Sequence, residues 1–333
     1  MTDARYDILG IGNAIFDILG HVDEAALTKQ GMVKGSMQLV TAEEVVAIDD
    51  MLTEAIRVSG GSAGNTVAGV ASLGGRAAFI GKVADDEFGE AYAHDMRRVG
   101  IEYRTSPLTG GAPTASSVIL VTPDGERTMN TFLGASQDLT VDDIDNDLVD
   151  NAAITFLEGY LFDPPHAKEA FRAAAERANK AGRIAALTLS DTFCVERHRG
   201  DFLDWLKRGQ IGIVFANEKE ALAMFEGDDI DTACRKLAEL VPTVVVTRSE
   251  KGARVISNGD VVDVPAESVS KIVDLTGAGD LFAGGFLLGH ARGKAPADCA
   301  RLGAIAAAEV ISHFGARPQV HLKELAAKSG FSL

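Results

Sequence analysis

Residues 274–286 read DLTGAGDLFAGGF, and this order of small, acidic and apolar side chains could bind a phosphate at a helix start. The pattern predicts a helix over 281–291, with Gly277, Ala278 and Gly279 at its N-terminal end. The first N–H groups of a helix have no partner within it, and the helix dipole is positive there. An anion could approach this backbone because the side chains are small. Asp280 would lie at the edge of the anion site, where it could take a proton from an attacking hydroxyl.

The same residues also suit a purely structural role, in which Asp280 stabilises a helix start and the glycines form a tight turn. Two other glycine-rich stretches do not fit phosphate motifs. GIGNAI has Ile15 where the dinucleotide fingerprint requires glycine. RAAFIGK has Arg76 and Val83 where a P-loop requires glycine and Ser or Thr. A dehydrogenase is therefore the weakest alternative.

Apolar runs that alternate with longer helical stretches predict the surrounding fold. Strands are expected at 6–12, 77–83, 153–159, 184–190, 211–217 and 243–249, and helices at 63–75, 88–100 and 165–182. Continuous apolar strands between helices favour a parallel sheet that is covered on both faces. The predicted class is α/β, with three α/β/α layers and a mainly parallel central sheet.

Two segments interrupt this alternation. Residues 13–45 are irregular, with a short strand-like piece at 37–41, and residues 112–133 resemble a hairpin. Asp124-Gly125 is a strong signal for the turn of that hairpin. We expect a single domain over 1–333, with a small β-sheet lid formed by about 13–45 and 112–133.

Composition and charge limit the classes of partner. The chain has 333 residues and a formal net charge of −16, which disfavours nucleic acid and anionic membranes. It contains no long apolar run and no signal-peptide pattern at its N-terminus. The three cysteines are far apart, and no histidine pair has zinc-ligand spacing. We therefore expect a cytoplasmic protein with small-molecule substrates, either a monomer or a homodimer.

The DLTGAGDLFAGGF stretch resembles the signature of the ribokinase (PfkB-type) family of sugar and nucleoside kinases. Further motifs agree in order over nearly the whole chain, from Asp7 to about Pro318. The resemblance implies a ribokinase-like fold that uses ATP and Mg²⁺. It further implies that Asp280 is the general base, that residues 277–279 form the anion hole, and that Thr276, Gly277 and Gly279 contact the nucleotide.

ANEKEA at 216–221 resembles the N-x-x-E motif of this family. The resemblance implies that Asn217 and Glu220 organise the Mg²⁺ that bridges the ATP phosphates, through water. Without the resemblance, Asn217 as a helix cap and Glu220 three residues later would form a variant of the capping box.

GNAIFD and GGSAGNT resemble the ribose-binding segments of the adenosine kinases in this family. The resemblance implies that the acceptor is held by Asn13, Asp17, Gly61, Ser62 and Asn65. A carboxylate can accept hydrogen bonds from both hydroxyls of a cis-diol, so Asp17 is the candidate for the ribose. The alternative for Asp17 is a solvated loop acid.

The resemblance also implies an apolar wall against the purine. Its candidate residues are Val40, Phe132, Leu133, Ala135 and Tyr160. These side chains could equally form the core of the lid. Arg127, at the lid hairpin, is either a phosphate contact or a solvated surface arginine.

The function expected from these motifs is ATP-dependent phosphorylation of the 5′-hydroxyl of adenosine to AMP. The alternative is a PfkB-type kinase for fructose or another free sugar, because the GGxxxN pattern is shared within the family. A non-catalytic regulator is disfavoured by the intact loop around Asp280. By analogy with the family, a monovalent cation such as K⁺ could bind near Asp274, Thr276 and residues 311–318.

Overall fold

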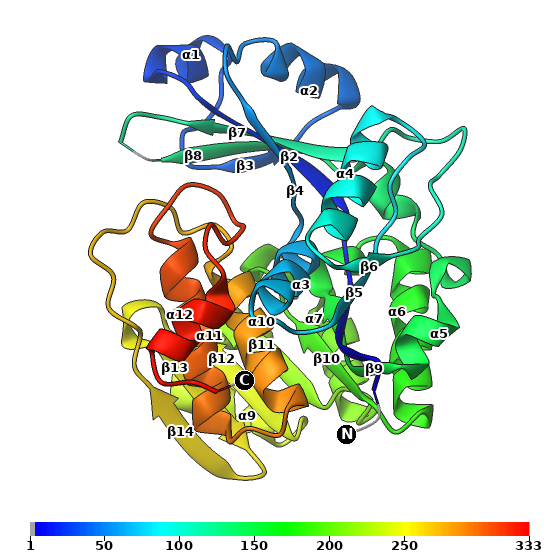
Figure 1. Ribbon diagram of the computed structural model, residues 1–333, viewed down its shortest axis with the longest axis vertical. Helices are drawn as coiled ribbons and strands as arrows, with labels where there is room; N and C mark the ends of the chain where they lie inside the picture. Colours follow the sequence, from blue (N-terminus) through cyan, green and yellow to red (C-terminus); the bar gives the residue numbers. More distant parts are fainter. Residues whose placement is uncertain (1–3, 125, 333) are drawn as a thin grey trace.

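The computed structural model describes residues 4–124 and 126–332, whose strands form two sheets (Figure 1). The larger sheet has nine strands in the order β14-β13-β12-β11-β10-β9-β1-β5-β6. The strands from β12 to β6 are parallel, and β13 and β14 add an antiparallel edge. The bounds are β1 (Tyr6–Ile11), β5 (Ala77–Ile80), β6 (Glu102–Tyr103), β9 (Ala152–Glu158), β10 (Ile184–Thr188), β11 (Ile213–Asn217), β12 (Thr243–Thr247), β13 (Ala253–Ser257) and β14 (Asp260–Val264).

Helices cover both faces of this sheet because successive strand residues point to opposite sides. In β1, Ile8 packs into the core under one set of helices, and Leu9 packs into the core under the other. The first set is α3 (Ser62–Ser72), α4 (Glu87–Arg98), α10 (Ala278–Ala291), α11 (Pro296–Val310) and α12 (Leu322–Lys328). The second set is α5 (Asn146–Asp150), α6 (Pro165–Lys180), α7 (Thr192–Lys207), α8 (Glu218–Phe225) and α9 (Ile230–Ala238).

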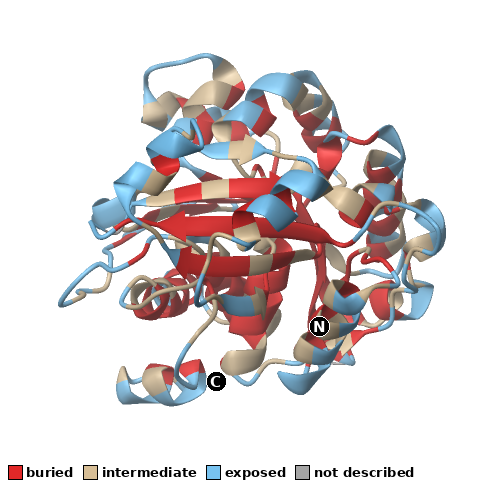
Figure 2. Cartoon of the chain, turned by 90° about the horizontal axis from the view of Figure 1, so that it is seen from above, coloured by how far each residue is buried: buried red, intermediate tan, exposed pale blue. Residues whose placement is uncertain are grey.

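The smaller sheet lies above the larger one in Figure 1 and has the strand order β3-β8-β7-β2-β4. Its strands are β2 (Ile15–His21), β3 (Met37–Leu39), β4 (Ile56–Ser59), β7 (Ala115–Val121) and β8 (Arg127–Phe132). Side chains such as Ile18 and Val118 pack with Leu27 of α1 (Glu24–Lys29) and Val45 of α2 (Ala42–Asp49). Seen from above, the strands are largely buried and the outer helices carry the exposed residues (Figure 2).

The structure confirms the predicted α/β class, with a mainly parallel sheet between two helical layers and a small second sheet. Segment 13–45 is more regular than expected, because it holds β2, β3, α1 and the start of α2. The smaller sheet also includes β4, at 56–59, outside the two segments expected to form it. Gly125 of the expected turn lies outside the described residues. Within the described part of the chain, the helices are too short or too polar to cross a membrane.

Helix α10 begins at Ala278, three residues before the predicted start, and ends at Ala291 as expected. It packs closely against α11 through two glycines: a Cβ added at Gly285 would lie 2.7 Å from the Cα and N atoms of Gly303. No side chain fits in that space, so this contact fixes how α10 lies on α11. The first turn of α10 carries Asp280.

The contact between α10 and α11 is tested by Gly285→Ala. We expect this change to lower the free energy of unfolding by about 1–3 kcal/mol, because the new methyl group meets backbone atoms that cannot move alone. The matched control is Gly200→Ala in α7, where an added Cβ meets no atom within 4 Å. That change should stabilise the protein by about 0.5–1 kcal/mol. Equal urea midpoints for the two variants would contradict the close-packing account.

Candidate active site

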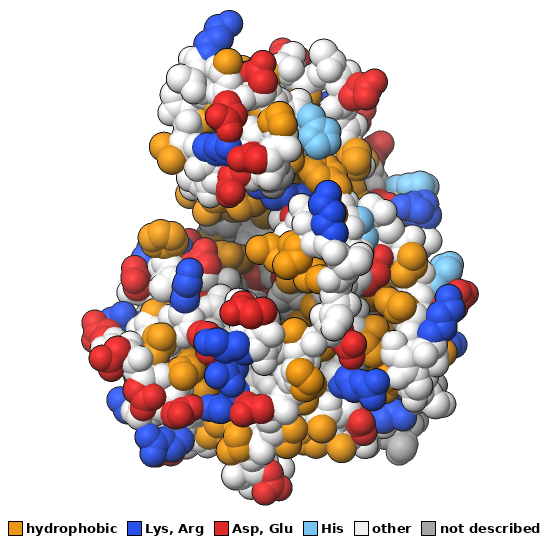
Figure 3. Space-filling view, turned by 90° about the vertical axis from the view of Figure 1, so that its left-hand side faces the viewer, with side chains coloured by type: hydrophobic (Ala, Val, Ile, Leu, Met, Phe, Trp, Pro, Cys, Tyr) orange, Lys and Arg blue, Asp and Glu red, His pale blue; other side chains and the backbone are white. Residues whose placement is uncertain are grey.

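A recess separates the smaller sheet from the larger body of the molecule (Figure 3). Two helices of the body, α3 and α10, begin at this recess, and the loop after β1 also ends there. In α/β proteins, ligands bind beyond the carboxyl ends of parallel strands, which is where this loop lies. The fold therefore brings the motifs of residues 12–17, 60–66 and 274–280 to one place.

Asp280 lies in the first turn of α10 and is held by two residues of α3. Its Oδ1 accepts a hydrogen bond from Ser62 Oγ at 2.7 Å, and its Oδ2 accepts one from Asn65 Nδ2 at 3.0 Å. Burial raises the pKa of the Asp280 carboxyl, and the two donors oppose that rise. The carboxylate is thus fixed in orientation at the mouth of the recess and remains only partly exposed.

The backbone beside Asp280 matches the expected anion loop. Gly277 has φ 79° and caps the helix, and a Cβ added there would lie 2.8 Å from Cβ of Ala316. A Cβ added at Gly279 would meet no atom within 4 Å, so open space lies in front of that residue. Among the described residues, the N–H groups of Gly277, Gly279 and Asp280 have no hydrogen-bond acceptor. These N–H groups are free to bind an anion.

The start of α3 is held by a carboxylate that the sequence did not reveal. Glu158, at the end of β9, accepts hydrogen bonds from Asn13 Nδ2 at 2.8 Å and from Ala63 N at 2.8 Å. Gly61 precedes α3 with φ 82°, and a Cβ there would lie 2.1 Å from the carbonyl oxygen of Asn13. This close approach ties the loop after β1 to the first turn of α3, from which Ser62 reaches Asp280.

Asp17 lies on the other side of the recess, in strand β2 of the smaller sheet. Phe16 stacks on Phe88 of α4 and Ile18 lies in the core, so Asp17 and Leu19 point to the opposite, inner face. A Cβ added at Gly60 would lie 2.1 Å from Asp17 Oδ2, so only glycine fits beside the carboxylate. Burial raises the pKa of Asp17 to about 7, against the nearby positive charges of two arginines. Asp17 is therefore a partly enclosed acid of the recess and not a solvated loop residue.

Arg127 joins the smaller sheet to the loop before α10. Its guanidinium pairs with the Asp274 carboxylate and donates to Thr276 Oγ1 at 2.6 Å. Only 11% of the Arg127 side chain is exposed, so the expectation of a solvated surface arginine is wrong. Asp274 also accepts hydrogen bonds from the N–H groups of Thr276 and Gly315, at 2.9 Å and 2.8 Å. Asp274 Oδ1 accepts only the bond from Thr276 and keeps a lone pair, so a monovalent cation near Asp274 stays a prediction.

Asn217 and Glu220 lie at the junction of β11 and α8 and form a complete capping box. Asn217 Oδ1 accepts from Glu220 N at 2.9 Å, and Glu220 Oε2 accepts from Asn217 N at 2.9 Å. The described residues contain no group of three or more His, Cys, Asp or Glu side chains that could enclose a metal. The oxygens of the pair still have free lone pairs. They could therefore bind the water ligands of a Mg²⁺ ion that phosphates hold, without binding the ion directly.

Four of the residues expected to form an apolar wall lie at or after the ends of β3 and β8 in the smaller sheet, whereas Tyr160 follows β9 of the larger sheet. Val40 and Phe132 are partly exposed and pack on the core, and Ala135 is fully buried. Tyr160 is tied to the loop after β10, because its hydroxyl donates to the Ser190 carbonyl at 3.3 Å. Leu133 is partly exposed and precedes the 3₁₀ turn at Gly134–Asp138.

Sequence reasoning missed other apolar side chains of the inner face. Leu19, Ile119 and Val121 of the smaller sheet pack with Met129 and with Phe314, which follows α11. The Phe314 ring stacks on His21 with centroids 5.4 Å apart. Strict alternation in β2 and β7 could have identified the strand residues, but Phe314 is distant in sequence and carried no signal.

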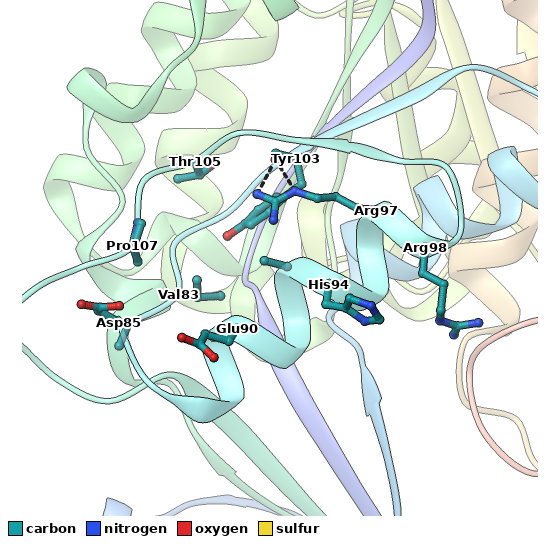
Figure 4. A pocket seen from close by; sticks show the side chains of 12 residues that line it. Val83, Asp85, Glu90, His94, Arg97, Arg98, Tyr103, Thr105 and Pro107 are labelled. Carbon is teal, nitrogen blue, oxygen red and sulfur yellow. Dashed lines mark hydrogen bonds between the residues drawn. The ribbon is translucent and has the colours of Figure 1, made fainter.

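A separate pocket of about 600 Å³ lies beside α4 (Figure 4). Val83, His94, Arg97 and Tyr103 are among the residues that line it, and Arg97 donates hydrogen bonds to the Tyr103 carbonyl. None of the expected site residues lines this pocket. It lacks both the free helix N-terminus and the fixed carboxylate of the recess, so we place the chemistry in the recess.

Comparison with known proteins shows the family of the chain. Residues 44–322 match the model of the pfkB family of carbohydrate kinases, and the chain belongs to that family. It is therefore an ATP-dependent kinase with a ribokinase-like fold, as the resemblance implied.

Individual relatives are similar over nearly the whole chain. A solved adenosine kinase from Sinorhizobium meliloti is 48% identical, with a TM-score of 0.92 and coverage of 98% of this chain and 100% of that one. A solved probable sugar kinase from Rhizobium etli CFN 42 is 45% identical, with a TM-score of 0.92 and coverage of 98% and 99%. Adenosine kinase 2 from Arabidopsis thaliana is 25% identical over 94% of this chain and 96% of its own length.

The role of the Asn217–Glu220 pair is tested by Glu220→Gln. If Glu220 orders Mg²⁺ through water, loss of its charge should raise the Mg²⁺ concentration for half-maximal rate several-fold. Acceptor affinity should change little, because the resemblance assigns the pair to the nucleotide rather than to the acceptor. A Mg²⁺ titration identical to that of the wild type, with only a lower melting temperature, would leave the pair as a helix cap.

Proposed function

We propose that this kinase transfers the γ-phosphoryl group of ATP to the 5′-hydroxyl of adenosine, forming AMP and ADP. One observation carries the proposal: the Asp280 carboxylate, fixed by α3, lies beside free N–H groups and faces a second acid, Asp17, on the smaller sheet. The similarity to adenosine kinases, at 48% identity in one case, supports the choice of acceptor.

In this proposal Asp280 acts as the general base. It accepts the proton of the 5′-hydroxyl as that oxygen bonds to the γ-phosphorus, while the bond from phosphorus to the ADP oxygen breaks. The hydrogen bonds from Ser62 and Asn65 keep the carboxylate oriented toward the recess. The N–H groups of Gly277 and Gly279 would stabilise the charge that the transferring phosphoryl group carries.

The nucleotide would lie over the carboxyl ends of β10 to β12. Asn217 ends β11, Glu220 lies in the first turn of α8, and Thr276 lies in the loop before α10. When bound, Mg²⁺ would neutralise charge on the ATP phosphates. The contribution of Asn217 and Glu220 would be to orient its water ligands from a rigid helix start.

The ribose would be held between the two sheets. Asp17 would accept hydrogen bonds from the 2′- and 3′-hydroxyls, and Asn13 would contact the same ring. The smaller sheet, with its segments 13–45 and 112–133 and strand β4, would serve as the lid of a single kinase domain. Val40, Phe132, Leu133 and Tyr160 would border the purine, with Ala135 packed behind them.

A second candidate is a kinase for a free sugar such as fructose. The similarity to a probable sugar kinase, at 45% identity, supports it. A free sugar would use Asp17 and Asp280 in the same way but would leave the apolar inner face of the smaller sheet without a ligand. We favour the nucleoside because Phe132, Leu133 and Phe314 stay partly exposed and could border a purine.

Asp17 should make the enzyme sensitive to the ribose hydroxyls. For the wild type, we expect kcat/KM for adenosine to exceed that for 2′-deoxyadenosine by roughly 10–10³-fold, because one acceptor lone pair then stays unpaired. Asp17→Ala should lower kcat/KM for both substrates and largely remove the difference between adenosine and 2′-deoxyadenosine. The measurement is a phosphate-transfer assay with adenosine, 2′-deoxyadenosine, inosine, ribose and fructose.

Two results of this assay would count against the proposal. Faster phosphorylation of fructose than of adenosine at equal concentration would establish the sugar kinase instead. Undiminished discrimination in Asp17→Ala would show that another group senses the 2′-hydroxyl.

A further inference from the structure

The recess holds more negative than positive charge. Asp17 of β2 and Asp280 of α10 face it, and Glu158 of β9 lies buried beneath the start of α3; burial raises the pKa of each of these carboxyls. A carboxylate that is to accept a proton or two hydroxyl hydrogen bonds must be ionised. With several acids close together, some fixed positive charge is needed for this.

The guanidinium of Arg317 places a positive charge beneath the recess. It belongs to the segment after α11, and its Nη2 donates to Ser59 Oγ at 3.1 Å. Ser59 in turn donates from its Oγ to Asp95 Oδ2 of α4 at 2.5 Å. A Cβ added at Gly64 would lie 3.5 Å from Arg317 Nη2, so the guanidinium packs against the first turn of α3. Ser62 and Asn65, which flank Gly64, are the residues that hold Asp280.

The guanidinium is not neutralised by a direct ion pair. Its Nε is buried and has no hydrogen-bond partner among the described residues. The described part of the chain shows no salt bridge to Arg317, whereas Arg127, the other cation near Asp17, pairs with Asp274. The positive charge of Arg317 can therefore stabilise the ionised form of the carboxyl groups around it.

The charged and titratable groups around Arg317 come from several elements. Asp17 of β2, Asp280 of α10, and Asp95 and Tyr92 of α4 are close enough to interact electrostatically with its guanidinium. Glu158 of β9 adds negative charge beside Asp280, and Arg127 of β8 adds positive charge beside Asp17. Arg317 is the cation that lowers the pKa of both Asp17 and Asp280.

We propose that Arg317 is a positioning residue that keeps the base and the acceptor-binding acid ionised and supports the turn of α3 that orients the base. In this role Arg317 acts through Asp17, Asp280 and the first turn of α3 rather than by binding the acceptor. The proposal rests on the roles given above to Asp280 and Asp17, but it does not require that the acceptor be adenosine.

The test is the pH dependence of kcat and kcat/KM for Arg317→Met, Arg317→Gln and Arg317→Lys. In wild type the rate should fall at low pH as Asp17 and Asp280 become protonated. Loss of the positive charge in the Met and Gln variants should move this acidic limb upward by about one pH unit. Their rates should therefore lie well below wild type near pH 6.5 and approach it at high pH. Lysine keeps a charge and should restore most of the profile.

Arg98→Met is the matched control. Arg98 donates to Asp95 Oδ1 at 2.6 Å, so its removal disturbs the same Ser59–Asp95 network, but its side chain is 63% exposed. This variant should keep the wild-type pH profile. Circular dichroism and melting curves establish which variants fold, and the lysine and glutamine variants carry the test if methionine prevents folding.

Two outcomes would overturn the proposal. In one, the rate of the Met or Gln variant falls by the same factor at every pH, which would make Arg317 a packing residue only. In the other, Arg317→Lys has the profile of the neutral variants. The profiles are measured with whichever acceptor the wild type phosphorylates, so a failure of the adenosine assignment is recognised separately, in the wild-type assay.

Discussion

The hydrogen bonds from Ser62 and Asn65 to Asp280 are the interaction on which the rest of the site depends. They join the first turns of α3 and α10, so two helix N-termini meet at one carboxylate. The Asp280 carboxylate can lie beside an anion-binding backbone because Ser62 and Asn65 stabilise its negative charge and fix its orientation. The close contact with α11 at Gly285 fixes the position of α10. The hydrogen bond from Ala63 N to the Glu158 carboxylate fixes the start of α3.

The smaller sheet completes the site from the opposite side. Alternation in β2 sends Phe16 toward Phe88 of α4 and Ile18 into the core, and it leaves Asp17 on the inner face. Arg127 ties the end of this sheet to Asp274 and Thr276, next to the anion loop. The acid proposed to bind the acceptor and the loop proposed to bind phosphate are thus coupled through one arginine.

Much of this arrangement could be predicted from sequence, because local patterns determine strand alternation and helix starts. Six parallel strands of the larger sheet and the C-terminal end of α10 followed from apolar runs and glycines. The edge strands β6, β13 and β14 were not predicted, and the start of α10 was placed three residues late. The capping box at Asn217 and Glu220 was weighed as an alternative and is present, so its metal role stays a prediction. Contacts between distant segments could not be predicted. Glu158, Phe314 and Arg317 reach the site only through tertiary packing, and Arg127 could not be paired with Asp274 before the two sheets were placed together.

The central claim is that the fixed Asp280 carboxylate takes the proton of the acceptor hydroxyl. It is tested most directly by single-turnover transfer from ATP in Asp280→Asn, with acceptor binding measured separately by calorimetry. The amide keeps the size of the side chain but cannot accept the proton. The account predicts a fall of the transfer rate by about 10²–10⁴-fold with nearly unchanged acceptor affinity. A folded Asp280→Asn variant that transfers phosphate at a near-normal rate would contradict it.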